Sequence, residues 1–271
     1  MTAATTRLRL RTDCVGAPHY RRRMGHTADV RLAAKPEESW YLEAVITPGT
    51  RLGTRPGDPT TFIRVAEVRE VTTIRIPSGR LIVDSPWPED DDPELTARVG
   101  RELAERIPPG IYRVEAAWTQ APYEFMGERF DGREVAAIRL CITETPVMSW
   151  EMALGVGDDI ETIRRGDRIG FNSETNMGSF SDAAAWPALT APFREFWRGC
   201  QSGNRQPRDT ESLFDDRFER ASDEGHGADL VTFPAEGPSV VWLGRTETGA
   251  IASVAVADGY HSSEGSEGEA Q

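Results

Sequence analysis

Four carboxylates supply most of the chemistry that this sequence could perform. Asp84 ends a predicted strand, and Glu151 lies in another strand beside Trp150. Glu174 and Asp182 lie in or just after a loop that contains glycine. Two carboxyl groups held within several ångströms push their pKa values apart, so that one can act as acid and the other as base in hydrolysis. If the fold brings these acids together, we expect a hydrolytic or ligand-binding site.

Each acid also has a structural explanation, which we favour for any one of them taken alone. Asp182 precedes three alanines and suits the N-cap of a short helix. Asp84 precedes Ser85 and a proline, as in a turn. Glu151 could form an ion pair with one of the arginines at positions 164, 165 and 168. The sequence leaves open whether the four side chains meet.

Residues 147–186 form the stretch around which we expect a site. They include apolar segments at residues 147–154 and 168–171, a loop at residues 172–181 with glycine and small hydroxyl side chains, and a short helix-like segment at residues 182–186. Loops of this composition on a rigid scaffold commonly carry binding and catalytic groups. The predicted ligand- or partner-binding residues are Asp84, Trp150, Glu151, Asn172, Glu174, Asp182 and Arg245.

Familiar catalytic and cofactor motifs are missing from the sequence. It contains no GxxxxGK[ST], GxSxG, HExxH or CxxC pattern. The run Gly155-Val156-Gly157 lacks the third glycine of a dinucleotide loop, and the two aspartates after it would repel a pyrophosphate. The four histidines show no ligand spacing. We therefore expect no metal site and no cofactor.

The net charge narrows the range of partners. The chain has 271 residues and a formal net charge of −13 at pH 7. An acidic surface disfavours general nucleic-acid binding, which depends on counterion release by a basic face, and it gives poor affinity for anionic membranes. No apolar stretch approaches the roughly 20 residues that span a bilayer. We expect a protein partner or a small molecule, rather than nucleic acid or a membrane.

Cysteine usage predicts a reducing compartment. The three cysteines, Cys14, Cys141 and Cys200, are odd in number, widely spaced and without a CxxC pair. No secretory signal is recognisable at the N-terminus. Free thiols in the cytoplasm are the natural interpretation.

The ends of the chain differ from its middle in composition. Residues 1–38 are basic and weakly periodic, and we predict a weakly ordered arm. Such an arm could bind nucleic acid or the chain's own acidic surface, but we favour a solvated arm or an edge strand. Residues 39–258 are predicted to form a single β-rich domain. Residues 259–271 are rich in serine, glycine and glutamate, which predicts a disordered acidic tail.

Alternating apolar residues and turn signals predict a fold dominated by strands. We predict strands at residues 39–47, 62–68, 71–76, 80–83, 111–118, 134–143, 230–233, 239–243 and 250–257. The three between residues 62 and 83 have the spacing of an antiparallel meander. Helices are predicted from Asp92 to Pro108, at residues 192–199 with a core-facing aromatic stripe, and at residues 211–222. The predicted fold class is α+β and β-rich, with mostly antiparallel sheets (sandwich-like or a partly open barrel) and two or three peripheral helices.

Several segments together resemble a known family. They are IPSGRLIVD at residues 76–84, PPGIYRV at residues 108–114, REVAAIR at residues 133–139, Trp150-Glu151, residues 170–182 and VWLGR at residues 241–245. Over about residues 62–258 the chain resembles a bacterial family known as domain of unknown function 4241. The resemblance implies no particular activity. It implies an aspartate and more glycines at residues 171–178 and a Gly-Asp-Gly-like turn at residues 235–239, so any site that those residues formed is altered here.

The sequence favours a binding or interaction protein over an enzyme. The motivation is the acidic surface, the seven tryptophans and the absence of catalytic motifs. An acidic protein can neutralise a basic toxin through electrostatic complementarity, so we consider a role in immunity, defence or regulation. The alternative is a hydrolase or small-ligand-binding protein that uses the carboxylates around residues 170–182.

Overall fold

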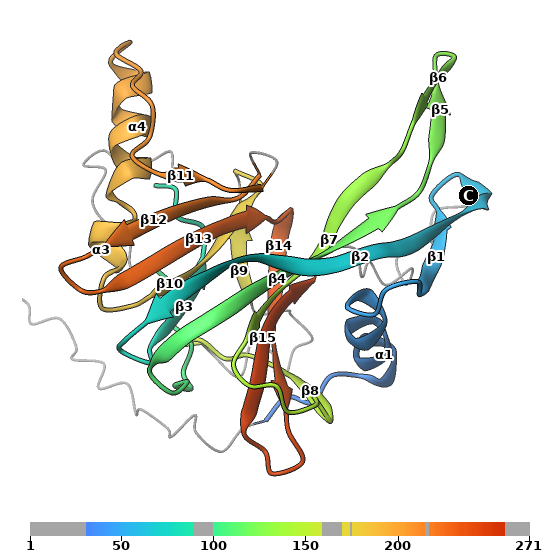
Figure 1. Ribbon diagram of the computed structural model, residues 1–271, viewed down its shortest axis with the longest axis horizontal. Helices are drawn as coiled ribbons and strands as arrows, with labels where there is room; N and C mark the ends of the chain where they lie inside the picture. Colours follow the sequence, from blue (N-terminus) through green and yellow to red (C-terminus); the bar gives the residue numbers. More distant parts are fainter. Residues whose placement is uncertain (1–30, 89–99, 159–169, 174, 215–216, 258–271) are drawn as a thin grey trace, which may run out of the picture.

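The structure is a computed structural model that describes residues 31–88, 100–158, 170–173, 175–214 and 217–257. Most of the predicted basic arm, the predicted acidic tail and Glu174 lie outside these residues. The same is true of the arginines at positions 164, 165 and 168, which were predicted partners of Glu151. Figure 1 shows two sheets packed face to face, with α1 (Pro36–Val45) on one side and α3 (Trp186–Leu189) and α4 (Ala191–Gln201) on the other.

The large sheet has the strand order β1-β2-β4-β7-β15-β14-β8, and β9 also pairs with β14. Its strands are β1 (Arg51–Arg55), β2 (Asp58–Ile76), β4 (Gly110–Gln120), β7 (Arg133–Cys141), β15 (Ile251–Ala257), β14 (Gly237–Arg245), β8 (Ser149–Met152) and β9 (Gly170–Ser173). Every pairing is antiparallel. Neighbours that run in opposite directions need only short connections, as the closely spaced turn signals predicted.

The small sheet has the order β11-β12-β13-β10-β3. Its strands are β11 (Glu211–Ser212), β12 (Glu219–Asp223), β13 (Ala228–Pro234), β10 (Met177–Asp182) and β3 (Leu81–Asp84). A separate two-stranded hairpin joins β5 (Tyr123–Phe125) to β6 (Glu128–Phe130). The β-rich, antiparallel, sandwich-like fold class with peripheral helices is therefore confirmed.

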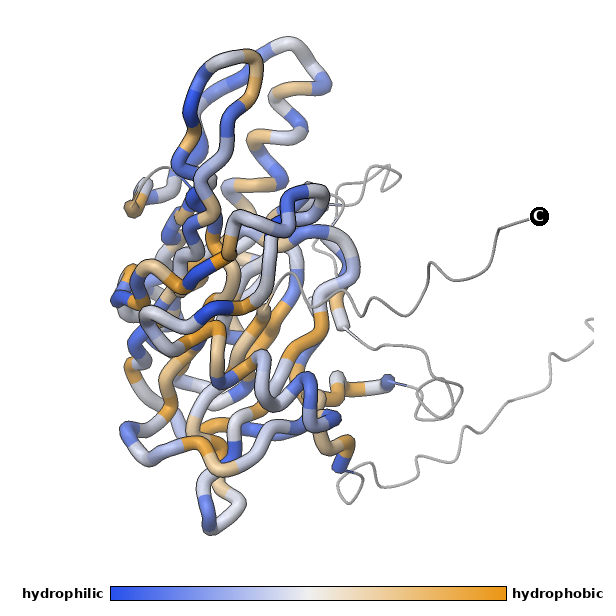
Figure 2. The backbone as a smooth tube through the Cα atoms, turned by 90° about the vertical axis from the view of Figure 1, so that its right-hand side faces the viewer, coloured by the Kyte–Doolittle hydropathy of each residue, from blue (hydrophilic) through white to orange (hydrophobic). Residues whose placement is uncertain are grey.

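The main core lies between the two sheets. It combines alternate residues of the large sheet, such as Val114 and Val254, with Phe180 and Phe233 of the small sheet. Successive side chains of a strand point to opposite faces, so every second residue enters this layer. Figure 2 shows the apolar residues concentrated along the central strands.

Helices cover the outer faces of both sheets. Tyr41 and Val45 of α1 pack on Ala117 and Ala137, which belong to the strands of the large sheet. On the small sheet, α4 buries Phe193, and Trp87 meets the ring of Phe193 edge-on at 5.4 Å and the rings of Phe196 and Trp197 at 5.8 and 6.4 Å. The predicted helix at residues 192–199 and its inward-facing aromatic residues are confirmed.

The strand predicted at residues 39–47 is wrong, because this segment is helix α1. Pro36 occupies the first turn, where a missing N–H has no cost, and the Lys35 N–H donates to the Glu38 carboxylate at 2.8 Å. Tyr41, Leu42 and Val45 are buried together, which is the spacing of one helix face. The apolar run by itself predicts a strand or a helix equally well, because its length suits either structure.

The helix predicted at residues 211–222 is also wrong. The segment forms β11 and β12, and β12 pairs with β13. Phe218 enters the core between the sheets, where its ring lies 6.1 Å from that of Trp118. Tertiary burial of this one side chain, together with the partner edge offered by β13, outweighs the local helical pattern.

Three smaller expectations also need correction. Most of the predicted loop at residues 172–181 belongs to β9 and β10, and the helix after it begins at Trp186 instead of residue 182. The strand after residue 80 pairs with β10 and so leaves the predicted meander. Residues 89–99 of the helix predicted from Asp92 lie outside the described residues. Residues 100–107 are not helical, and Leu103 forms a bridge with Gly155.

Candidate functional site

Glu151 and Arg245 are the two predicted site residues that meet. They lie on neighbouring strands β8 and β14, and the Arg245 Nε donates to Glu151 Oε1 at 2.7 Å. Arg245 Nη2 donates both to Glu151 and to Glu105, a residue outside the predicted set. The side chains of Arg245 and Glu151 are 4% and 9% exposed, whereas that of Glu105 is 47% exposed.

The electrostatics of this triad are those of a structural ion pair. Burial disfavours the charge on Arg245, but the hydrogen bonds to Glu105 and Glu151 outweigh it and raise the pKa of Arg245. Arg245 is therefore a fixed cation that neutralises a buried carboxylate. Trp150 belongs to the opposite side of the sheet, where it packs with Leu42 of α1.

Asp182 and Asp84 are buried and hydrogen-bonded by their own surroundings. The Asp182 carboxylate accepts hydrogen bonds from the backbone N–H and the hydroxyl of Ser78, both at 2.8 Å, and from the Ala184 N–H at 2.7 Å. Asp84 accepts the backbone N–H groups of Ser85 and Arg101, each at 2.8 Å. Both carboxylates hold adjacent turns against the small sheet by these hydrogen bonds.

The predicted residues do not converge on one point. Asp182 pairs with Leu81 and Asp84 pairs with Ser179, so the two acids stand three residues apart along adjacent strands, roughly 10 Å. Asn172 is exposed on β9 opposite Pro238, seven residues along β14 from Arg245 and thus about 23 Å away. Glu174 lies outside the described residues.

Hydrogen bonds between Ser173 and Met177 close the turn between β9 and β10. The Ser173 hydroxyl accepts the Met177 N–H at 2.6 Å and donates to the Met177 carbonyl at 2.8 Å. Asn176 adopts a left-handed φ of 55°, which asparagine tolerates better than most residues. The loop that the sequence suggested as a site is a tight turn leading into the core.

Two observations bear on nucleophilic and metal chemistry in the described part of the chain. Burial raises the pKa of the Cys141 thiol, which keeps it protonated and a weak nucleophile. Within the described ranges, no three His, Cys, Asp or Glu side chains are grouped so as to hold a metal ion. None of the helices described there is long and apolar enough to cross a membrane.

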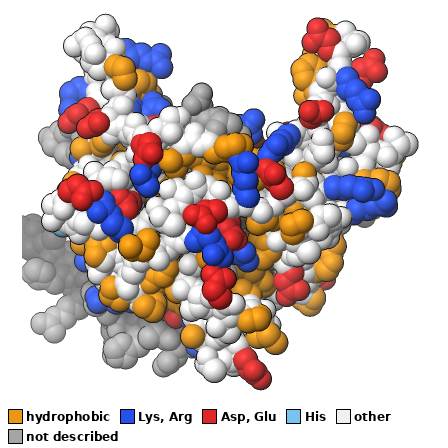
Figure 3. Space-filling view, in the orientation of Figure 1, with side chains coloured by type: hydrophobic (Ala, Val, Ile, Leu, Met, Phe, Trp, Pro, Cys, Tyr) orange, Lys and Arg blue, Asp and Glu red, His pale blue; other side chains and the backbone are white. Residues whose placement is uncertain are grey.

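A large concave surface lies elsewhere, between two projecting hairpins. One hairpin joins β1 to β2 and the other joins β5 to β6, and the space between them, here called the hairpin groove, measures about 1160 Å³. Figure 3 shows the β5–β6 hairpin standing clear of the body beside this hollow. Its walls include three arginines, two acids and several aromatic rings: Arg55, Arg64, Arg129, Asp58, Glu124, Phe62, Tyr123 and Phe125.

The groove exists because β2 and β4 separate. Their ladder ends at the pair Arg64–Gln120, beyond which residues 58–63 of β2 pair with β1 alone. On the other side the chain continues from β4 into β5, which pairs with β6 alone. In the described structure, the edges of β2 and β5 that face the groove therefore carry no strand partner.

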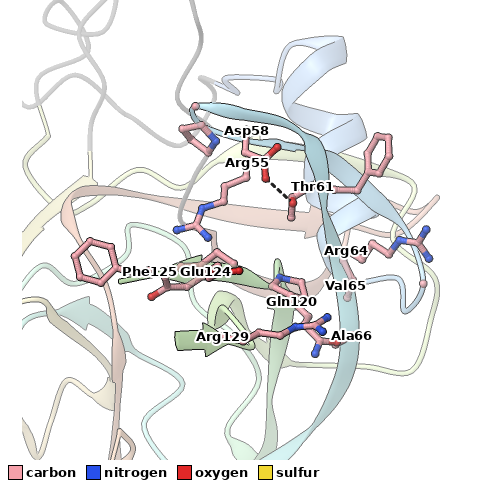
Figure 4. A pocket seen from close by; sticks show the side chains of 16 residues that line it. Arg55, Asp58, Thr61, Arg64, Val65, Ala66, Gln120, Glu124, Phe125 and Arg129 are labelled. Atoms are coloured by element: carbon pink, nitrogen blue, oxygen red, sulfur yellow. Dashed lines mark hydrogen bonds between the residues drawn. The ribbon is translucent and has the colours of Figure 1, made fainter. Parts of the chain in front are cut away.

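Arg55 spans the groove from one hairpin to the other. Its guanidinium carbon lies 3.7 Å from the centre of the Tyr123 ring, a cation–π distance, and Figure 4 shows the side chain directed toward Glu124 and Phe125. Arg55 Nη1 is buried and makes no hydrogen bond within the described part of the chain. A buried donor without an acceptor is costly, so this atom marks a position where an acceptor would be favoured.

Each hairpin tip is a two-residue turn with a distinct local cause. Pro56-Gly57, with Gly57 at φ 79°, closes β1 onto β2, as expected for a proline–glycine turn. Asp58 follows it and accepts hydrogen bonds from the hydroxyls of Thr60 and Thr61, both at 2.6 Å. These bonds lower the pKa of Asp58 to about 2.

The other tip consists of Met126-Gly127, both at positive φ. Two positive φ values are typical of the hairpin turn that favours Asn-Gly, so a methionine there is strained. Met126 is 88% exposed and Phe125 is 58% exposed. The composition around Gly127 predicts a polar loop, whereas the signal for an exposed apolar tip is the pair of large apolar residues directly before Gly127.

Comparison with protein families gives one match. The model of the family described as "Protein of unknown function (DUF4241)" matches residues 74–256. No curated protein and no solved structure matches the chain significantly. The match covers the small sheet and the large sheet from β4 onward, whereas α1, β1 and residues 58–73 of β2 lie outside it.

Proposed function

We propose, for a chain that belongs to the DUF4241 family, a function in binding another macromolecule through the hairpin groove, without catalysis. The observation that carries the proposal is the exposure of Phe125 and Met126 at the tip of a projecting hairpin. Large apolar side chains in such a position contribute nothing to the core, and exposed apolar surface commonly marks an interaction site.

The composition of the groove supports this assignment. Aromatic residues and arginine are enriched at protein interfaces, where flat rings and planar guanidinium groups give large contact areas. Arginine by itself is weak support here, because Lys35 is the only lysine in the chain. The aromatic rings next to those arginines, such as Tyr123 beneath Arg55, are the stronger support.

The alternative of hydrolysis or small-ligand binding by the predicted carboxylates has less support. Glu151, Asp84 and Asp182 are each held by arginine, hydroxyl or backbone N–H groups of the protein itself. A catalytic acid or base must reach the substrate, which these buried and saturated groups do not. A Glu151→Gln variant that kept its stability but lost turnover of a metabolite would revive this alternative.

The cellular setting is part of the same proposal. Cys141 and Cys200 are both free thiols, which suits a reducing cytoplasm. A role in defence, immunity to a toxin or regulation fits a protein that acts by binding to a partner protein. Cell fractionation tests the location, and recovery of the protein outside the cytoplasm would contradict it.

Comparative capture from an extract of the native host tests the binding function. The tagged full chain is compared with a Phe125→Ser/Met126→Ser variant and with a matched Ile111→Ser/Met148→Ser control, whose residues are exposed and apolar but lie outside the groove. We expect the wild type and the control to retain the same partner and the groove variant to lose it. Identical recovery by all three proteins would refute a binding role for the groove.

A further inference from the structure

The unpaired strand edges indicate how the hairpin groove binds. Among the described residues, segments 58–63 of β2 and 123–125 of β5 each have one neighbouring strand, and their other edges face the groove. Backbone N–H and C=O groups on a free edge are ready to pair with an added strand. A strand between two such edges would gain hydrogen bonds on both sides.

The arrangement of β2 and β5 on either side of the groove restricts the direction and length of an added strand. Because β2 and β4 are antiparallel and β5 continues β4, an inserted strand must be antiparallel to one wall and parallel to the other. Neighbouring strands lie about 4.8 Å apart, so the added strand can pair with both walls only where they have separated to about twice that distance. The β2 wall offers six residues and the β5 wall three, so pairing on both sides is limited to about three residues. The groove closes at the Arg64–Gln120 pair, which sets the inner end of the strand.

The side chains of the groove indicate the chemistry of the occupant. The lining contains Arg55, Arg64 and Arg129 together with Asp58 and Glu124. It therefore has one more basic than acidic group, although the whole chain is strongly acidic. The Asp58 carboxylate is already engaged by Thr60 and Thr61. Arg55 Nη1 is a buried donor that lacks an acceptor in the described structure. These features together favour carboxylate oxygens on the ligand.

We propose that the hairpin groove binds an extended acidic segment of a partner protein by strand addition, with ligand carboxylates on Arg129 and a backbone carbonyl of the added strand on Arg55 Nη1. The inference rests on the proposed binding function and specifies the partner that the groove accepts. Alternation of side chains along the added strand places acidic and apolar residues at every second position. The apolar residues would contact the rings of Phe62, Tyr123 and Phe125.

Fluorescent decapeptides measure this specificity directly. We compare three capped peptides on the full chain by fluorescence anisotropy: one alternating valine and glutamate, one with lysine in place of glutamate, and one with proline in place of alternate valines. We expect the glutamate peptide to bind about tenfold or more tightly than the other two, because lysine reverses the charge and proline removes backbone donors. Equal affinity of the three peptides, or no binding of the glutamate peptide, would overturn the proposal.

Two charge-reversal variants test whether the peptide binds in the hairpin groove. Arg129→Glu should weaken binding of the glutamate peptide about tenfold, whereas Arg106→Glu, an exposed arginine outside the groove, should leave it unchanged. Both positions are exposed, so both variants should keep the melting temperature of the wild type. Equal affinity of the two variants would place the peptide elsewhere and reject the assignment.

Hydrogen exchange distinguishes strand addition from contact through side chains alone. Bound peptide should slow amide exchange within residues 58–63 and 123–125, and exchange unchanged in both segments would contradict pairing. If the peptides fail but capture from the host still depends on Phe125 and Met126, the binding function stands and the acidic-strand assignment falls. Dimerisation that groove variants abolish would identify a second copy of the chain as the occupant and would also overturn it.

Discussion

The buried ion pair between Arg245 and Glu151 provides a direct test of whether these residues serve the fold or a ligand. Replacing Arg245 by methionine keeps most of the side-chain volume but leaves Glu151, which is 9% exposed, without its cation. An unpaired buried carboxylate costs about 3–5 kcal/mol. We therefore expect Arg245→Met to lower the free energy of unfolding by that amount and the melting temperature by roughly 6–20 °C.

The reciprocal change should be milder. In Glu151→Gln the amide oxygen still accepts from Arg245, and Glu105 keeps the guanidinium paired. The loss is then the difference between a charged and a neutral hydrogen bond, about 1–2 kcal/mol. Glu105→Gln is the matched control, because its carboxylate is 47% exposed and should contribute less than about 1 kcal/mol.

A double-mutant cycle completes the test. Arg245→Met/Glu151→Leu replaces both charges by apolar groups, and such replacements are commonly neutral or stabilising relative to a broken pair. Urea denaturation of the four proteins should show that the double variant recovers about 2 kcal/mol or more of the loss in Arg245→Met. The structural interpretation fails if Arg245→Met costs less than about 1 kcal/mol, or if the double variant is no more stable than Arg245→Met. It also fails if the fully stable double variant loses partner binding.

Three further predictions concern the hairpin tips and the core. Met126→Asn should relieve the left-handed strain at the turn. We expect the free energy of unfolding to rise by about 1 kcal/mol and the melting temperature by roughly 2–4 °C. Calorimetry measures the melting temperature, and an unchanged or lower melting temperature contradicts the strain. Asp58, whose hydrogen bonds lower its pKa from 3.8 to about 2, should stay ionised through pH 4, and its support of the turn should disappear as the pH falls from 4 toward 2. Carbon-detected NMR titration of the carboxyl group measures this, and a midpoint near 3.8 is the contrary result. Gly178→Ala should cost about 1–3 kcal/mol, because a Cβ would lie 2.5 Å from the buried Phe233 ring and 2.7 Å from that of Phe171; a thermal midpoint equal to the wild type would show that the rings can move.

Local sequence signals predicted most of the strands. The alternating segments that became β4, β7, β13, β14 and β15 lie within a few residues of their predicted bounds. Their β-branched residues suit a pleated and half-buried surface, and their flanking glycines and prolines stop the pairing. The aromatic stripe of α4 was likewise predicted, because helical spacing is a local property.

Where a sequence pattern fits both a helix and a strand, the neighbouring elements in the fold decide which of the two forms. The apolar run in α1 suits a strand of its length as well as a helix. It is a helix because the outer face of the large sheet offers Ala117 and Ala137 as a shallow surface for Tyr41 and Val45. The segment of β12 became a strand because β13 presented a free edge to it.

The sequence by itself determined the β-rich class, the antiparallel arrangement and the residue types available for chemistry. Tertiary structure alone decided which of those residues meet. Glu105 and Arg245 are 140 residues apart in sequence, and Asp182 and Ser78 are 104 apart. Such contacts depend on the order of strands in a sheet, which local periodicity does not encode. The hairpin groove has the same origin, since it arises where β2 and β4, paired along most of their length, separate after Arg64 and Gln120.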